Sequence, residues 1–306
     1  MKEMLKILRR CILLVIVIVI IIVIIPSKLN ATESDSQKTL LFSADIHGKL
    51  DNLNTWLNSM KLQYGTKVDS VAYGGDYADT FNISVIQSIR VLTKNYFPGA
   101  NQVYALGNHE WKQDESNKIP IDGLPFGSSG VKVNTNNYAI FAVSASSWKQ
   151  EISLKDIDLL NKFLDNTNKN KPVFVVAHYP LHTYTFTSKS TDMLPKTRTT
   201  KNAKRMIEVL NRHPNVIYLW GHNHTRKDTN YGTIKVAGDV IEYKPDQYFA
   251  IDFAYASMGC MKDGASLDIY GLSANINDKE NEREVQLSYT NLTNRIGEPV
   301  TISFLK

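Results

Sequence analysis

Five short apolar runs in the sequence end abruptly in aspartate, asparagine or histidine. Each run is rich in β-branched and aromatic residues, which predicts a buried strand. Between the runs lie stretches in which apolar residues recur at helical spacing. Strands that alternate with helices predict an α/β fold. The expected strands are residues 39–44, 70–74, 102–106, 172–177 and 215–220, and the expected helices are residues 49–65, 83–92, 153–167 and 201–212.

The rest of the chain contains loops and further strand-like runs. Residues 120–130 are rich in glycine and proline, and residues 183–200 are rich in threonine, serine and lysine, so both are expected to be loops. From about residue 232 the helical period disappears and several strand-like runs follow. This β-rich part predicts a second sheet or an added β layer.

The polar residues that follow the five apolar runs are all hard or borderline metal ligands. Ligands of open α/β sheets bind outside the carboxyl ends of the strands, so these residues are expected to meet. His222 and His224 lie two positions apart on an extended segment, and both imidazoles can therefore face one point. The five groups are "DIHG" (45–48), "GGDYAD" (74–79), "GNHE" (107–110), His178 and "GHNH" (221–224).

Each group taken alone has an ordinary structural explanation. Asp45 with His47 would suit a turn that caps the next helix, and Asp76 with Asp79 would suit an Asx turn. A single histidine such as His178 is more often structural than a ligand. Five such coincidences at five strand ends, in this chain order, favour one shared site.

The series of groups resembles the signature of calcineurin-like metallophosphoesterases over residues 39–224. The resemblance implies a four-layer αββα sandwich of two mixed β-sheets flanked by helices. It also implies two metal ions, each a divalent or trivalent Mn, Fe or Zn ion. Matched by position, Asp76 bridges the ions. The other implied ligands are Asp45, His47 and His224 for one ion, and Asn108, His178 and His222 for the second.

The resemblance implies hydrolysis of phosphate esters by a hydroxide that bridges the two ions. Asp76 and His109 are the implied catalytic residues, and His109 would give a proton to the leaving group or stabilise its charge. A purely structural role is the alternative for His109. Glu110 would either orient His109 or cap the next helix.

Two departures from related patterns narrow the subclass. Protein serine/threonine phosphatases of this superfamily carry Asp-Arg-Gly where this chain has Asp79-Thr80-Phe81, so an arginine that grips phosphate is missing there. Purple acid phosphatases place a tyrosine ligand at the position of Asp79. The sequence therefore argues against a protein phosphatase and against an iron site with a tyrosine ligand.

Residues 1–31 are expected to be a membrane anchor or a signal peptide. Four basic residues precede an unbroken apolar run over residues 11–25, which places the N-terminus in the cytoplasm and the rest of the chain outside. Residues 32–38 are polar and are expected to be a tether, followed by a metallophosphoesterase domain over residues 39–306. The expected partners are a phosphate-ester substrate and the membrane.

Charge and cysteine content narrow the function further. Four of the five net positive charges lie in residues 1–28, so the remaining chain is nearly neutral and no nucleic-acid partner is expected. The two cysteines, Cys11 and Cys260, leave no disulfide within the exported part. A cyclic-nucleotide or other phosphodiesterase on the same site is an alternative to a phosphatase. A non-catalytic, surface-anchored binding protein is less favoured, because every expected ligand is present.

Overall fold

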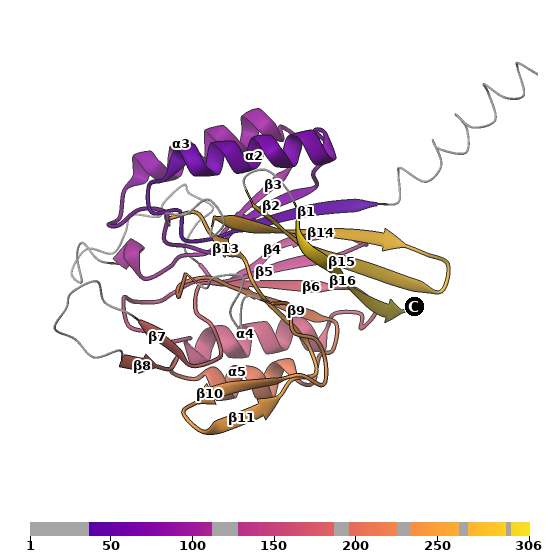
Figure 1. The fold of residues 1–306 in the computed structure, drawn as a ribbon. Coiled ribbons are helices and arrows are strands. Elements are labelled where there is room, and N and C mark those ends of the chain that lie inside the picture. The colour runs from indigo at the N-terminus through magenta and orange to yellow at the C-terminus, as the bar shows by residue number, and fades with distance from the viewer. Residues whose placement is uncertain (1–36, 112–127, 187–195, 225–232, 263–268, 292–294) are drawn as a thin grey trace, which may run out of the picture. The chain divides into compact units, whose positions relative to one another are not determined.

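Two β-sheets pack face to face, and two helices cover the outer face of each (Figure 1). The structure is a computed structural model that describes residues 37–111, 128–186, 196–224, 233–262, 269–291 and 295–306. Within Lys38–Lys306, one compact unit, the layers follow the order αββα. The expected four-layer sandwich of two mixed sheets is confirmed.

The first sheet has a parallel part and an antiparallel part. In the order β16-β15-β14-β1-β2-β3, the strands β1, β2 and β3 are parallel, and β14 joins β1 in the antiparallel sense. The short strand β13 pairs with β14. The strands are β1 (Lys38–Ser43), β2 (Ser70–Tyr73), β3 (Asn101–Tyr104), β13 (Gly259–Cys260), β14 (Tyr270–Asp278), β15 (Glu282–Asn291) and β16 (Arg295–Leu305).

The second sheet has the order β12-β9-β6-β5-β4, and all its pairs are parallel except β4 with β5. Two small antiparallel pairs, β7 with β8 and β10 with β11, lie outside both sheets. The strands are β4 (Gly130–Asn134), β5 (Ala139–Val143), β6 (Val173–Ala177), β7 (Tyr184–Phe186), β8 (Lys196–Arg198), β9 (Val216–Trp220), β10 (Val240–Lys244), β11 (Gln247–Ala250) and β12 (Ala254–Ser257).

The helices cover the sheets with the apolar faces that their sequences predict. On α2, the residues Leu53, Trp56, Leu57 and Met60 are buried against the first sheet. Asn82 caps α3 by accepting hydrogen bonds from two backbone N–H groups of the first turn. The helices are α2 (Leu50–Tyr64) and α3 (Ile83–Tyr96) on the first sheet, and α4 (Leu154–Asp165) and α5 (Ala203–Leu210) on the second.

Alternating side chains of the strands supply the three apolar cores. On β1, Leu40 and Phe42 point between the sheets, whereas Leu41 points toward the helices. Because the parallel strands are buried on both faces, their sequences are continuous apolar runs rather than alternating ones. The polar residues that follow these runs therefore mark the strand ends clearly.

The β-rich C-terminal part differs from the expectation of a separate sheet or layer. Its strand β12 extends the second sheet, and β13 to β16 extend the first sheet beyond β1. The physical reason is that β1 would otherwise present an unpaired edge, which β14 fills over five residue pairs. No helix within the described residues is long and apolar enough to cross a membrane. The expected anchor, residues 1–31, and most of the expected tether lie outside the described residues.

Candidate metal centre

The carboxyl ends of five strands from the two sheets meet at one edge of the sandwich. Contacts between the sheets hold them there: the backbone N–H of His222 donates to Asp45 Oδ2 at 2.8 Å, and His178 Nδ1 lies 2.8 Å from the carbonyl oxygen of Gly74. The side chains that the sequence predicts as ligands lie together here. We call them the candidate metal centre, which comprises Asp45, His47, Asp76, Asn108, His178, His222 and His224.

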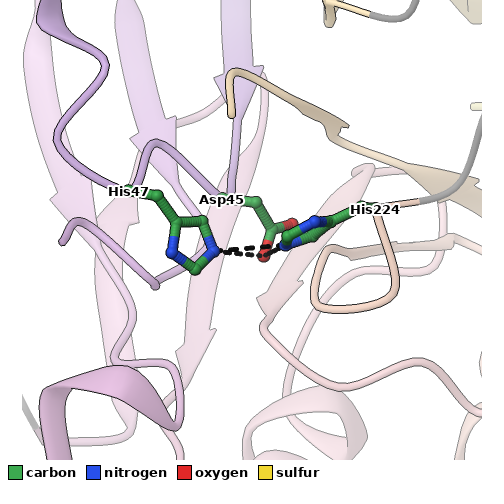
Figure 2. Close-up of side chains that lie close together, drawn as sticks. All are labelled: Asp45, His47 and His224. Atoms are coloured by element: carbon green, nitrogen blue, oxygen red, sulfur yellow. Dashed lines mark hydrogen bonds and ion pairs between the residues drawn. The ribbon is translucent and has the colours of Figure 1, made fainter. Parts of the chain in front are cut away.

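Three of these residues, Asp45, His47 and His224, form a first group (Figure 2). His224 Nε2 lies 3.4 Å from Asp45 Oδ1 and 3.1 Å from His47 Nε2. Asp45 is fully buried, and its Oδ1 atom has no hydrogen-bond partner. A buried carboxylate oxygen without a donor is costly unless a cation satisfies it.

The second group contains Asp76, Asn108, His178 and His222. Because a carbonyl oxygen only accepts, the contact with Gly74 places the proton of neutral His178 on Nδ1. Its Nε2 then presents a lone pair to Asn108 Oδ1 at 3.0 Å and to Asp76 Oδ2 at 3.3 Å. His222 Nδ1 lies 3.0 Å from the same Nε2 atom. Such a convergence of acceptor atoms suits a cation, with the far ring nitrogen of His178 fixed by the backbone.

Asp76 joins the two groups. Its Oδ2 atom lies 3.3 Å from His178 Nε2 and 3.7 Å from His47 Nε2, so one oxygen faces a histidine of each group. Its Oδ1 atom accepts a hydrogen bond of 2.9 Å from the backbone N–H of His109. Asp76 is therefore a carboxylate that both groups share.

The electrostatics favour ionised carboxylates and largely neutral imidazoles. Burial opposes ionisation of Asp45 and Asp76, but the neighbouring histidines hold the pKa of each carboxyl below its usual value. Burial lowers the pKa of His47 to about 4 and, together with His178, that of His222 to about 3. Burial also opposes protonation of His178, yet the charge of Asp76 raises its pKa to about 9. A metal ion would displace that proton.

The backbone is strained at the centre. Five of its residues have left-handed φ angles: Asp45 (52°), His47 (48°), Asp76 (56°), His222 (75°) and His224 (47°). Each costs about 1–3 kcal/mol, and such residues cluster at functional sites. The surrounding hydrogen bonds, which include His47 N–H to Asp76 O at 2.9 Å, must hold this geometry.

Glu110 has a different role from the two that the sequence suggests. Its buried carboxylate accepts hydrogen bonds from the backbone N–H groups of Asp76, Tyr77 and Gly107 at 2.9, 2.9 and 2.7 Å. Glu110 therefore ties the loops after β2 and β3 together. Burial and the charge of Asp76 raise its pKa to about 7, although the three donors favour the charged form.

Asp79 is a residue whose role the sequence analysis missed. Its Oδ1 atom lies 2.8 Å from His47 Nδ1, so a carboxylate orients a candidate ligand through the ring nitrogen that faces away from the centre. Its backbone carbonyl accepts a hydrogen bond of 2.7 Å from His109 Nδ1. The one available signal was its place three residues after Asp76.

His109 lies beside the centre. Since its Nδ1–H donates to the carbonyl of Asp79, its Nε2 atom faces inward, 3.7 Å from Asp76 Oδ2. Its ring packs edge-on against His47, with the centroids 4.6 Å apart. The side chain is 15% exposed, so a substrate can reach it.

Gly107 must lack a side chain, because a Cβ atom there would lie 2.2 Å from Asp76 Oδ1 and 2.9 Å from His178 Cε1. We expect Gly107→Ala to displace Asp76, to remove most of the bound metal and to lower hydrolysis by about 100-fold or more. Metal analysis and phosphatase assays would measure both effects. Gly99→Ala is the matched control, since a Cβ atom there meets nothing within 4 Å. Full metal content in Gly107→Ala would contradict the geometry.

Comparisons with known proteins identify the family of the chain. A family model described as calcineurin-like phosphoesterase matches residues 38–226 of the 306-residue chain. A search of curated proteins gave no match. Among solved structures, the purple acid phosphatase PPD1 from yellow lupin (Lupinus luteus) seeds is 12% identical, with a TM-score of 0.55 over 88% of this chain and 54% of that one. The chain thus spans about half the length of the lupin enzyme, and the likeness is one of fold.

A second solved structure, phosphopantetheinyl hydrolase from Mycobacterium tuberculosis, is 12% identical with a TM-score of 0.37, covering 74% of this chain and 91% of that one. The family match alone covers more than half of the chain and includes all seven residues of the candidate metal centre. It confirms the family that the strand-end motifs predict and supports a metal-dependent phosphoesterase. The protein belongs to the calcineurin-like phosphoesterase family.

Proposed function

We propose that this protein is a binuclear metal-dependent phosphoesterase that hydrolyses phosphate esters at the candidate metal centre. The observation that carries the proposal is the place of Asp76, whose Oδ2 atom faces a histidine of each ligand group. A carboxylate shared in this way can offset the repulsion between two cations.

The donor set fits metal ions of the Mn, Fe or Zn type. Asp45, His47 and His224 would hold one ion, Asn108, His178 and His222 would hold the other, and Asp76 would contact both. The buried Oδ1 atom of Asp45, which faces His224 Nε2 at 3.4 Å but accepts no well-formed hydrogen bond, supports this assignment, because a cation would satisfy it. Four imidazoles and one amide complete the shells without added negative charge that would repel a phosphate.

When bound, the two cations would supply an acidified water as nucleophile and stabilise charge on the phosphoryl oxygens. The chain itself supplies orientation and proton transfer. Asp76 lies between the ligand groups. Its carboxylate accepts a hydrogen bond from the His109 backbone N–H, which fixes its position. His109, held through Nδ1 by the Asp79 carbonyl, directs Nε2 toward the centre and can protonate the leaving oxygen there.

The test is turnover by the purified protein with Mn, Fe or Zn. We expect the metal-loaded protein to hydrolyse an aryl phosphate monoester or diester, to lose activity on chelation, and to regain it when metal is restored. Chelation should also lower the melting temperature, because bound metal stabilises the folded state. Comparison of the two esters separates a phosphatase from a phosphodiesterase. Absence of hydrolysis in a protein that carries two metal ions would contradict the proposal.

We also propose that the catalytic unit acts outside the cytoplasmic membrane, anchored by residues 1–31 or released by cleavage of that segment. The apolar run over residues 11–25 and the basic residues before it support this location. Protease accessibility of the unit on intact cells would test it, since an internal unit would resist digestion.

A further inference from the structure

Lys262 brings a positive charge to the edge of the candidate metal centre. Its Nζ atom lies 3.2 Å from Asp79 Oδ1, the same oxygen that lies 2.8 Å from His47 Nδ1. The ammonium is thus one carboxylate away from a candidate ligand.

The backbone around Lys262 is attached to the centre. The N–H of Met261 donates to the carbonyl of Asp45 at 3.2 Å, and the side chain of Asn52 donates to the carbonyl of Met261 at 2.8 Å. Pairing of β13 with β14 holds the preceding residues. The backbone next to Lys262 is therefore held beside the first ligand group, and the position of its ammonium depends on the side-chain rotamer.

The ammonium can bind an anion while it remains near Asp79. Asp79 is the one acceptor that Lys262 contacts among the described residues, and an ammonium has three N–H donors. The Lys262 side chain is 31% exposed, so its charge faces a solvated approach. Asp79 also accepts a hydrogen bond from His109 through its backbone carbonyl, so Lys262 and His109 contact the same residue.

We propose that Lys262 binds negative charge on the substrate and makes the enzyme select phosphate monoesters over diesters. This inference rests on the proposed phosphoesterase function. A phosphate monoester carries about −1.5 to −2 charges at pH 7 because its second pKa is about 6, whereas a diester carries one. Coulomb attraction is proportional to charge, so a nearby cation stabilises the bound monoester about twice as much.

The experiment compares Lys262→Met and Lys262→Arg with the wild type, all loaded with metal. An aryl monoester and a diester of the same phenol provide the two substrates. We expect Lys262→Met to lower kcat/KM by about tenfold for the monoester and by about threefold for the diester. Calorimetry should show weaker binding of inorganic phosphate to Lys262→Met, with unchanged metal content. Lys262→Arg should retain most of the kcat/KM for the monoester and most of the affinity for phosphate. Lys155→Met, on the exposed face of α4, is the control for an equal change of charge.

A purely structural role for Lys262 gives a different pattern. If Lys262 only held Asp79 and His47, Lys262→Met would lose metal and both esters would slow by the same factor, which would overturn the proposal. Equal phosphate affinity in Lys262→Met and wild type would also overturn it. Lack of hydrolysis of both esters by the wild type would count against the proposed function itself. The affinity for inorganic phosphate would still test the role of Lys262 in that case.

Discussion

Replacing Asp76 by asparagine is expected to lower kcat/KM by about three orders of magnitude or more, because several kcal/mol of transition-state stabilisation depend on the paired cations. Asparagine keeps the shape of the side chain but removes the negative charge between the two histidine groups. The Oδ2 atom of Asp76 lies 3.3 Å from His178 Nε2 and 3.7 Å from His47 Nε2. Without its negative charge, the repulsion between the two bound metal ions would not be offset. We expect metal occupancy to fall together with hydrolysis, measured as metal per chain and as turnover.

Asp158→Asn is a suitable control for Asp76→Asn, because Asp158 is exposed on α4 and undergoes the same chemical change. It should retain full activity and metal content. Circular dichroism would show whether Asp76→Asn remains folded. A folded Asp76→Asn protein with unchanged turnover and two metal ions would contradict the bridging role.

His109→Ala is expected to retain its metal and to lose about 10²- to 10⁴-fold in turnover, the usual range for general acid catalysis. The loss should be large for an alkyl phosphate, whose leaving oxygen needs a proton, and smaller for a nitrophenyl phosphate, whose leaving group is stable as an anion. Rates on the two substrates under the same metal conditions would measure the difference.

The two substrates also serve as the internal control for His109→Ala. A structural defect would slow both reactions alike and would lower the metal content, because His109 packs against His47. Full activity of His109→Ala on the alkyl phosphate would remove His109 from the proposed mechanism. A metal-free variant would assign it to support of the ligands instead.

Local patterns in the sequence predict the α/β fold and the strand ends at which the centre lies, whereas the four-layer sandwich and the ligand set were implied by the family resemblance. Apolar runs such as residues 172–177 and 215–220 are long enough to identify buried strands, and their last residues lie at the carboxyl ends where parallel strands bring ligands together. The structure brings these side chains to one place, and their binding of metal stays a prediction.

The sequence does not predict short strands that lack a continuous apolar run. β4 lies partly in the expected glycine-rich loop, and β7 and β8 lie in the expected loop over residues 183–200, because their strand conformation comes from pairing rather than from apolar pattern. Residues 248–256, one of the strand-like runs expected after residue 232, divide between β11 and β12, and the side chain of Asn211, just after α5, accepts a hydrogen bond from the N–H of Asp252 between them.

Residues that support the centre were equally hidden. Glu110 reaches the N–H groups of Asp76 and Tyr77 across two loops, and Lys262 reaches Asp79 across a sequence separation of 183 residues. Charged residues of this kind resemble ordinary surface residues in a sequence. Their roles depend on distances that only the folded chain sets.

The pairing of β14 with β1 determines where an expressed form of the protein can end. The family match stops at residue 226. Residues beyond 270, however, form β14, which pairs with β1, the strand that leads into Asp45. A truncated protein that ends at residue 226 would expose the edge of β1, which favours aggregation, and would also lack Lys262. Expression plasmids should therefore extend through Leu305.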